Sequence, residues 1–309
     1  MKDLWVEKYR PKKIEEYVFK DKAQKRQVEG WIAEKSIPHL LFSGGPGVGK
    51  TTLAKVLLHE IDADWGDVLE INASRERGID TIRDKITNFC STLPFGPFKY
   101  IILDEADYTT EAAQASLRGV MEQYASSVRF ILTCNYPHRI IPAIHSRCQG
   151  FHIEHLDETN FMVRLGEILV AEEVEFGIPT LELYVKATYP DLRKCINLCQ
   201  MNSQTGQLIE PHRSESSGPD YRVEMVKLFQ QGKITEARKL VCEKASPAEY
   251  EDIFKFLYRN LDYWNSTKEG QDEAILIIRD SLVKHTTCAD PEINLAACLV
   301  QLDMLRKGS

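Results

Sequence analysis

The chain has 309 residues, of which 43% are hydrophobic and 28% charged, the balance of a globular protein large enough for two or three domains. No apolar run approaches the roughly 20 residues of a membrane-spanning helix, and residues 1–5 lack the apolar stretch of a signal peptide. The net charge is −7, but residues 1–55 alone carry +5, so the acidic total does not exclude nucleic acid as a partner.

Eight cysteines are scattered along the chain without the paired spacings of a zinc site or of a secreted disulfide framework. Cys195 and Cys199 lie one helical turn apart and could in principle bind a metal ion. Because no second pair accompanies them, two core thiols are the favoured interpretation. We therefore expect a reduced, intracellular protein.

Over the first 150 residues, apolar runs typical of strands alternate with amphipathic stretches typical of helices. Because the helices lie between the strands, the pattern predicts an α/β domain with a mainly parallel sheet. The predicted strands are Leu40–Ser43, Val68–Asn72, Tyr100–Asp104 and Val128–Thr133, with a weaker fifth at Phe151–Ile153.

After about Glu154 the strand signal disappears and the chain is predicted to be helical. In this half, Pro190 and Asp191 mark a break that is followed by a new helix start. From Asn202 to Asp220 the sequence is rich in Ser, Gln, Gly and Pro, the composition of a linker. We therefore predict four parts, namely a nucleotide-binding domain over 1–154, a small helical domain over 155–205, a linker over 206–220 and a second helical domain over 221–309.

The run GGPGVGKT, from Gly44 to Thr51, is a complete phosphate-binding loop (P-loop) between a predicted strand and a helix over about 50–59. Its glycines let backbone N–H groups wrap a phosphate without Cβ clashes, at the positive end of a helix dipole. Lys50 would reach the β- and γ-phosphates, and the Thr51 hydroxyl would bind Mg²⁺. The predicted site for a nucleoside triphosphate consists of Gly44, Gly45, Pro46, Gly47, Val48, Gly49, Lys50, Thr51 and Thr52.

Acidic residues follow the predicted strand over 100–104. Asp104 would hold the Mg²⁺ ion, and Glu105 would polarise the attacking water. An ordinary acidic turn is the alternative, but the P-loop about 50 residues earlier favours the catalytic interpretation. The tetrapeptide at 104–107, DEAD, is also the signature of a large helicase family, whose motors need two tandem domains. Since this chain has one P-loop, we set that interpretation aside.

Three further polar residues allow two interpretations each. Asn135 follows a strand and could orient the hydrolytic water against Glu105, or simply favour a turn. Arg147 could be an arginine finger for a neighbouring subunit's γ-phosphate, or form a surface ion pair. Arg193 lies in the first turn of a helix that Asp191 can cap, where a cation opposes the helix dipole unless an anion lies in front of it. A solvent-facing arginine is the alternative there.

Together these motifs resemble the AAA+ family and, within it, the sliding-clamp loaders. Over residues 4–200 the chain is similar to replication factor C small subunits. The chain's length and the weak similarity of its last domain resemble the large, ATPase subunit of T-even-type phage clamp loaders, and archaeal or eukaryotic small subunits are the close alternative. The bacterial form usually carries a four-cysteine zinc insert, which this chain lacks. The segments that carry the resemblance are Leu4–Pro11, Glu70–Asp80, Leu117–Glu122 and Ser146–Cys148.

The resemblance implies an ATP hydrolase of a DNA polymerase clamp loader, with an α/β AAA+ domain, a helical lid and a helical C-terminal collar. ATP binding would drive a homo- and hetero-oligomeric, ring-like pentamer to bind and open a sliding clamp. Primer–template DNA would then trigger hydrolysis and release of the clamp on DNA. The expected location is the cytoplasm, that of the host if a phage encodes the chain, with no membrane partner.

Two other functions are the alternatives to that prediction. One is another AAA+ DNA-associated ATPase, such as a branch-migration motor or an initiator. Initiators usually append a basic recognition helix, and none is evident after Tyr221. The other is a non-hydrolysing structural subunit of the loader. The presence of Lys50, Thr51, Asp104 and Glu105 favours the catalytic subunit instead.

The resemblance also implies roles for single residues. Asn135 and Arg193 would be the first and second sensors of the nucleotide, and Arg147 the finger supplied in trans. Asn72 would be a polar switch that restrains Glu105 until DNA is bound. Gln114 and Arg118 would couple the sites of adjacent subunits. The segment beside the nucleotide base would comprise Trp5, Lys8, Tyr9, Arg10 and Pro11, with plain core packing as the alternative for the two aromatic residues.

Basic residues cluster at the start of one predicted helix, which in the family lines the chamber that holds DNA. Helix N-termini and arginines both suit phosphates, and such contacts carry little sequence information. A solvated, salt-bridged face is the alternative, because Glu76, Asp80 and Asp84 lie alongside. The predicted DNA-contacting residues are Arg75, Arg77 and Arg83, with Lys85 nearby; Arg75 is the least secure, since many relatives carry acidic residues there.

Overall fold

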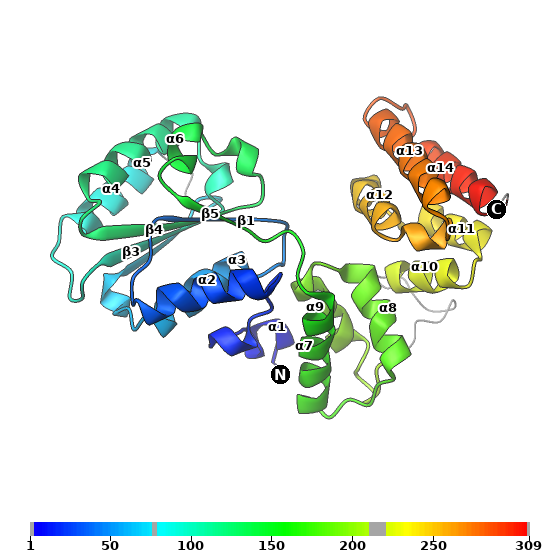
Figure 1. Cartoon of the computed structure of the whole chain (residues 1–309), viewed down its shortest axis with the longest axis horizontal. Coiled ribbons are helices and arrows are strands. Elements are labelled where there is room, and N and C mark those ends of the chain that lie inside the picture. The colour runs from blue at the N-terminus through cyan, green and yellow to red at the C-terminus, as the bar shows by residue number, and fades with distance from the viewer. Residues whose placement is uncertain (1–2, 76–78, 210–220, 308–309) are drawn as a thin grey trace. The chain divides into compact units, whose positions relative to one another are not determined.

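The computed structural model describes residues 3–75, 79–209 and 221–307, which fold into two compact units (Figure 1). One unit comprises Met1–Glu172 with Tyr189–Asn197, and the other comprises Glu173–Thr188 with Leu198–Ser309. The division falls inside the segment predicted to be a separate helical domain. The four-part division of the chain therefore stays a prediction, which the contacts within the two units do not decide.

A five-stranded parallel sheet forms the centre of the first unit, in the order β2-β3-β4-β1-β5. The α/β fold with a parallel sheet, predicted from the alternating pattern, is confirmed. The apolar strand interiors follow from their position, since a parallel sheet covered by helices is buried on both faces. The strands are β1 (Leu40–Ser43), β2 (Val68–Asn72), β3 (Lys99–Asp104), β4 (Val128–Cys134) and β5 (Gln149–His152).

The predicted bounds of four strands agree with the structure to within one residue, whereas β5 begins two residues earlier than predicted. Its first residues, Gln149 and Gly150, are exposed and carry no apolar signal. They nevertheless pair with Leu40 and Leu41 of β1. β5 is an edge strand, and edge strands pair through the backbone without needing a buried side chain at each position.

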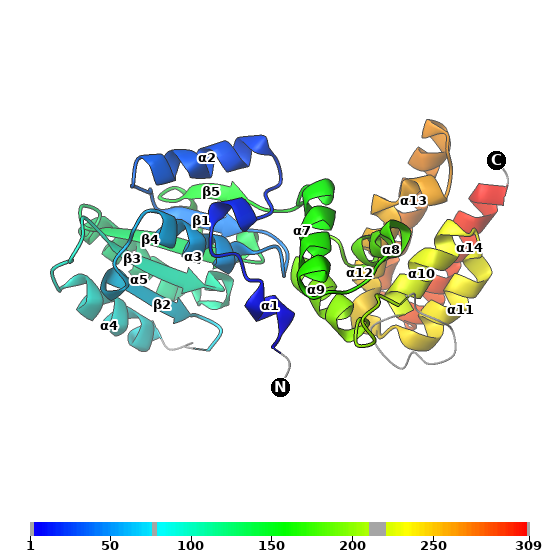
Figure 2. The same cartoon turned by 90° about the horizontal axis from the view of Figure 1, so that it is seen from below.

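Helices cover both faces of this sheet, with α4, α5 and α6 on one side and α2 and α3 on the other (Figure 1). Figure 2 views the same sheet face on, with the strands in their order from β5 to β2. A short N-terminal helix, α1, and the helix after the last strand, α7, belong to the same unit. The bounds are α1 (Trp5–Lys8), α2 (Lys22–Ala33), α3 (Lys50–Glu60), α4 (Ile79–Cys90), α5 (Glu111–Gln123), α6 (Pro142–His145) and α7 (Glu158–Ala171).

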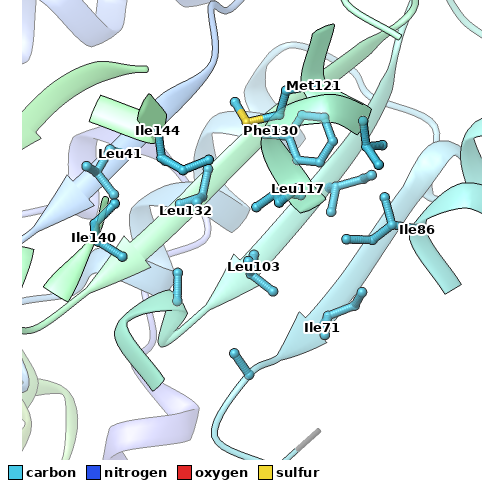
Figure 3. Packing of buried hydrophobic residues seen from close by; sticks show 14 of the residues in the cluster. Leu41, Ile71, Ile86, Leu103, Leu117, Met121, Phe130, Leu132, Ile140 and Ile144 are labelled. Atoms are coloured by element: carbon cyan, nitrogen blue, oxygen red, sulfur yellow. The ribbon is translucent and has the colours of Figure 1, made fainter. Parts of the chain in front are cut away.

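The core of the first unit lies between the sheet and the helices of the α4–α6 face. Figure 3 shows Leu103, Phe130 and Leu132 of the strands beside Leu117 and Met121 of α5. All five side chains are buried. This packing fixes the strands, and therefore the loops at their carboxyl ends, in one arrangement.

In the second unit, the elements longer than a single bridge are all helices among the described residues. Trp264 is fully buried there, stacks edge to face on Phe229 at 5.3 Å, and donates from its Nε1 to the carbonyl of Leu257 at 3.2 Å. Its helices are α8 (Ile178–Thr188), α10 (Tyr221–Gln230), α11 (Ile234–Lys244), α12 (Tyr250–Arg259), α13 (Lys268–His285) and α14 (Pro291–Lys307), while α9 (Leu192–Met201) is divided between the units.

Part of the predicted linker over 206–220 is packed rather than free. Gln207 pairs with Glu175 in a short parallel bridge, and the Tyr184 hydroxyl donates to the carbonyl of Ile209 at 2.7 Å. Leu208 between them is buried. Residues 206–209 therefore belong to the folded second unit, while 210–220 lie outside the described residues. No described helix is at once long and apolar enough to cross a membrane.

Candidate functional site

The carboxyl ends of β1, β3 and β4 meet at one edge of the sheet. Ser43 of β1 is in register with Cys134 of β4, and Asn72 of β2 with Asp104 of β3. In open α/β sheets this edge is the usual position of a ligand site, at the point where the strand order reverses. The P-loop follows β1 directly, so the fold brings it beside the residues that follow β3 and β4.

The P-loop backbone can be built only with glycine at two positions. Gly44 has φ of 153°, and a Cβ there would lie 2.0 Å from the carbonyl oxygen of Ile153. Gly47 has φ of 71°, and its Cβ would lie 1.7 Å from a carboxylate oxygen of Asp191. The loop leads into α3, whose N-cap residue, Gly49, offers no side-chain cap. The first N–H groups of α3 can therefore bind an anion.

Lys50 lies under this loop and is only 8% exposed. Its ammonium donates to the carbonyls of Gly44 at 2.9 Å and Gly45 at 2.6 Å, and to Oδ1 of Asn135 at 2.8 Å. Burial lowers the pKa of Lys50 to about 8, although the charges of Asp104 and Asp107 act in the opposite direction. The bond between Lys50 and Asn135 joins the P-loop to the end of β4.

Asp104 accepts two hydrogen bonds on the same oxygen, from the hydroxyls of Thr51 and Thr133, each at 2.6 Å. The predicted metal pair, Thr51 and Asp104, is thus in direct contact. Thr133 was not predicted as a site residue, because threonine is common in strands and the strand pattern alone explains it. Its hydroxyl also accepts from the backbone N–H of Glu105 at 3.0 Å, so it ties β4 to the turn after β3.

Glu105 begins that turn with a left-handed backbone, φ 56° and ψ 43°. This conformation is unfavourable for a residue with a side chain by roughly 1–2 kcal/mol, so the surrounding contacts must hold it. The pocket that Glu105 lines also includes Asn135 and Arg193. Outliers of this kind concentrate at functional sites, and here the outlier is the predicted water-activating residue.

Asn72, the predicted switch, bonds to the turn after its own strand. Its amide oxygen accepts from the backbone N–H and the hydroxyl of Ser74, at 3.0 and 2.7 Å, and from the N–H of Arg75 at 3.3 Å. Among the described residues, none of the hydrogen bonds of Asn72 reaches Glu105. The switch role stays a prediction.

A second, more apolar pocket adjoins the first, and the two share Arg10, Gly47, Gly49, Thr52 and Arg193. Its lining includes Tyr9 and Pro11, two of the residues predicted to lie beside the nucleotide base. A largely apolar pocket next to a phosphate-binding loop suits a nucleobase. The lining residues that the sequence did not predict are Val6, Tyr17, Val18, Leu156, Arg164, Leu192 and Ile196.

Hydrogen bonds tie the N-terminal segment to α7. The Tyr9 hydroxyl donates to Glu172 at 2.7 Å, as does the ammonium of Lys8, and Arg164 donates to the carbonyl of Tyr9 at 3.1 Å. Trp5 of the same segment is buried. The segment therefore serves both interpretations, core packing and pocket wall, at once. Apart from this segment and the P-loop, no local motif predicts the wall, because its other residues come from distant parts of the chain.

Arg193 reaches the P-loop from the first turn of α9. The carboxylate of Asp191 accepts from the N–H of Lys194 at 2.9 Å and so caps α9, as the sequence predicts. Arg193 lines both pockets, and its charge lowers the pKa of Lys50 as the smallest of several effects. A cation at this helix start is thus directed at the place where phosphates would lie.

Arg147 lines neither pocket of its own chain. Its guanidinium forms an ion pair with Glu122 of α5 and donates to the carbonyl of Ala143 at 2.7 Å. Arg118 lies 3.9 Å from the same glutamate. The surface ion pair, one of the two interpretations of Arg147, is therefore present, and it leaves the role in trans open.

Gln114 is buried on α5, one turn before Arg118. Its amide donates to the carbonyl of Arg139 at 3.0 Å and accepts from the N–H of Ile141 at 2.8 Å. Gln114 thus fastens α5 to the segment that leads to α6. Any coupling between subunits would start from this junction.

Of the predicted DNA-contacting residues, two are described. Arg75 lies in the turn before α4 and Arg83 lies on α4, and both are exposed. Arg77 lies outside the described residues. Exposure allows contact with a partner but does not distinguish DNA from solvent.

Comparison with known proteins gives three kinds of similarity. The model of the ATPase family associated with various cellular activities (AAA) matches residues 40–154. The replication factor C small subunit of Archaeoglobus fulgidus is 38% identical over 99% of this chain and 98% of its own length. That of Methanococcus vannielii is 36% identical over 99% of this chain and 100% of its own length. The Thermotoga maritima RuvB Holliday junction branch migration motor has a TM-score of 0.55 at 15% identity, covering 76% of this chain and 80% of its own, which bears on the fold alone.

The similarity to the archaeal proteins extends beyond the first 200 residues. It covers 99% of the chain and so includes the C-terminal helical region, for which the sequence motifs had indicated only a weak likeness. Archaeal small subunits were the alternative to the phage type, and these relatives are of that kind.

Proposed function

Because the chain belongs to the family of replication factor C small subunits and is an ATPase subunit of a clamp loader, we propose that its site hydrolyses ATP with Mg²⁺ under the control of a sliding clamp and primer–template DNA. The observation that carries this proposal is the convergence of Lys50, Asp104 and Asn135 on one pocket after β1, β3 and β4. The convergence provides a phosphate-binding cation, an acidic metal ligand and a polar group together.

The donor set fits Mg²⁺ bound beside phosphates. Thr51 and Asp104 offer a hydroxyl and a carboxylate oxygen in mutual contact, and hard oxygen ligands are those that Mg²⁺ prefers. Among the described residues, no cluster of three or more His, Cys, Asp or Glu side chains could hold a metal ion by itself. This agrees with a Mg²⁺ ion held by one or two protein ligands together with the nucleotide phosphates and water. When bound, Mg²⁺ would neutralise charge on the phosphates.

The predicted site residues would then have the following roles in hydrolysis. Lys50 and the N–H groups of the P-loop would hold the phosphates, and Arg193 would neutralise them from α9. Glu105 would orient and polarise the attacking water, with Asn135 on its other side. Arg147 would stabilise the transition-state charge in the pocket of the adjacent subunit. The base would lie against Tyr9, Arg10 and Pro11.

The partners and the organisation of the chain form a second part of the proposal. The chain would assemble with other loader subunits, of its own and a second kind, into a ring-like pentamer. Residues 1–154 would form the AAA+ domain, 155–205 the lid and 221–309 the collar that carries the assembly, with the linker limited to 210–220 because 206–209 pack in the second unit. Arg75, Arg77 and Arg83 would contact DNA phosphates from the start of α4. The expected location is the cytoplasm.

The alternatives have less support. The likeness to the branch-migration motor is one of fold, at 15% identity, whereas the likeness to clamp-loader subunits extends over the whole chain at 35–38%. A non-hydrolysing loader subunit would not need Glu105, and the strained backbone at this residue supports a catalytic role.

The test is the ATP hydrolysis rate of the purified loader complex, with and without a sliding clamp and primed DNA. We expect clamp and DNA together to raise the rate severalfold. Glu105→Gln should lower kcat by about 100-fold or more, because a general base contributes that much, and should leave the nucleotide dissociation constant within about threefold. Glu111→Gln is the matched control, since Glu111 is exposed in the first turn of α5 and lines neither pocket. An ATP hydrolysis rate that is the same with and without clamp and DNA would contradict the proposal.

A further inference from the structure

The acidic run after β3 contains a buried carboxylate that has no role so far. Asp107 is 4% exposed and lies in the single turn of 3-10 helix Ala106–Tyr108, directly after Glu105. One oxygen, Oδ2, accepts from two successive backbone N–H groups, those of Asn135 at 3.2 Å and Tyr136 at 3.1 Å. The other oxygen, Oδ1, is buried and makes no hydrogen bond within the described residues.

These two bonds cross between two loops of the pocket. Asp107 belongs to the turn that begins with Glu105, while Asn135 belongs to the loop after β4. The side chain of Asn135 in turn accepts from Lys50 at 2.8 Å. A continuous chain of hydrogen bonds therefore runs from Asp107 through the backbone and amide of Asn135 to the P-loop lysine. Two further hydrogen bonds join the ends of β3 and β4, since the Thr133 hydroxyl accepts from the N–H of Glu105 at 3.0 Å and donates to Asp104 at 2.6 Å.

Fastening two loops with a buried carboxylate is unfavourable in free energy. Burying a charge is unfavourable unless its hydrogen bonds compensate, and here one oxygen gets none. A charged acceptor, however, binds backbone N–H groups more strongly than a neutral one. Such an arrangement is therefore expected where function requires the loop to keep one position.

The same chain has a second carboxylate of this geometry outside the site. Asp67 is 1% exposed, its Oδ2 accepts from the N–H groups of Phe95 and Gly96, both at 2.7 Å, and its Oδ1 likewise makes no hydrogen bond within the described residues. Asp67 lines neither pocket of the candidate site. Each of the two aspartates thus fixes a loop through two backbone N–H groups. The loop that Asp107 fixes contains Asn135, which lines the pocket, whereas the residues that Asp67 fixes line neither pocket.

We propose that Asp107 is a positioning residue for ATP hydrolysis, which holds the backbone of Asn135 so that its amide stays in place between Lys50 and Glu105. The proposal deepens the function proposed above and rests on it. Asp107 acts through Asn135 and touches no substrate itself.

The experiment compares matched variants of the two aspartates in the assembled loader with clamp and primed DNA. Asp107→Ala should lower kcat by about 10-fold or more, because small misplacements of a reacting group have effects of that size. The KM for ATP and the dissociation constant of a fluorescent ADP analogue should stay within about threefold. Asp67→Ala should lower the melting temperature about as much as Asp107→Ala does. It should nevertheless leave kcat within about threefold of the wild type. Asp107→Asn keeps an acceptor oxygen and should restore most of the rate, also if the alanine variant folds poorly.

A double variant tests whether Asp107 acts through Asn135. If it does, Asp107→Ala combined with Asn135→Ala should hydrolyse ATP no more slowly than Asn135→Ala alone, because residues that act as a unit are not additive. Full additivity of the two effects would overturn the inference, and so would equal losses of kcat in the alanine variants of Asp107 and Asp67. If the ATP hydrolysis rate of the wild-type loader did not change on adding clamp and DNA, that result would instead contradict the proposed function. Wild-type rates in Asn135→Ala would remove this inference alone.

Discussion

The chemistry of Lys50 depends strongly on its surroundings. Its ammonium lies under the P-loop, bonded to two loop carbonyls and to Asn135. Burial lowers the pKa of Lys50 to about 8, from an ordinary value of 10.5. The charge that a triphosphate needs is therefore only partly present in the free protein at slightly alkaline pH.

This pKa predicts how nucleotide affinity depends on pH. Bound phosphates favour the charged ammonium, so the complex holds its proton to a higher pH than the free protein does. Above pH about 8, binding must therefore take up a proton, and affinity should fall by up to about tenfold per pH unit. Below that pH, Lys50 is charged in both states and its contribution should be flat. Titration with a fluorescent ADP analogue from pH 7.5 to 9.5 measures the slope.

Lys50→Arg is the control for this profile. A guanidinium stays charged throughout the range, so the variant should bind more weakly or equally but without the alkaline loss. Parallel profiles for the wild type and Lys50→Arg would show that another group is responsible for the pH dependence.

At the scale of elements, the P-loop and α9 are fitted to each other. The carboxylate that caps α9, that of Asp191, lies where a Cβ on Gly47 would be. This contact explains why the third glycine of the loop is needed, which the motif by itself attributes only to phosphate binding. The same contact positions Arg193 at the pocket, because Arg193 lies in the turn of α9 that Asp191 caps.

Gly47→Ala should therefore destabilise the protein as well as weaken nucleotide binding. The alanine would sit at φ 71°, and moving Asp191 away would release the N–H of Lys194. The two effects together are roughly 2 kcal/mol of unfolding free energy. Urea unfolding followed by tryptophan fluorescence, without nucleotide, measures the loss.

Gly45→Ala is the matched control from the same loop. A Cβ there meets no atom within 4 Å, and Gly45 does not have a positive φ. Its unfolding free energy should change by less than about 0.5 kcal/mol. Equal losses for the two variants would show that the contact with Asp191 does not constrain the loop.

At the scale of the whole molecule, the predicted arginine finger lies outside the two described pockets of its own chain. Arg147 lines neither of its own pockets and is paired with Glu122 on α5. If the finger is supplied in trans, a competent site is assembled from two chains. The pocket and the finger can then be inactivated separately.

Mixing two inactive variants tests this arrangement. Lys50→Ala inactivates the nucleotide pocket of its chain and leaves the arginine finger intact. Arg147→Ala removes the finger and leaves the pocket intact. Each alone should hydrolyse ATP at least about tenfold more slowly than the wild type. In mixed assemblies, some sites would combine an intact pocket with an intact finger, so the mixture should regain activity measured with clamp and primed DNA.

The control mixture combines Lys50→Ala with a variant that carries both substitutions, and no arrangement of these chains gives a competent site. It should stay inactive. A mixture of the single variants that also stays inactive, although it assembles, would rule out the finger in trans.

The sequence by itself determined the features that short, contiguous patterns encode. The P-loop, the strands predicted over 100–104 and 128–133 and the cap at Asp191 follow from local spacing and backbone preferences. The confirmed fold and family rest on these patterns. Local signals suffice there because each element forms from neighbouring residues.

Only the tertiary structure decided which distant residues meet. Tyr17, Leu156 and Ile196 look like ordinary core residues in the sequence, and they become a pocket wall because the fold brings them beside the P-loop. Asp107 and Asn135 are 28 residues apart, and nothing local indicates that one holds the backbone of the other. Such contacts depend on packing between elements, which side-chain periodicity does not encode.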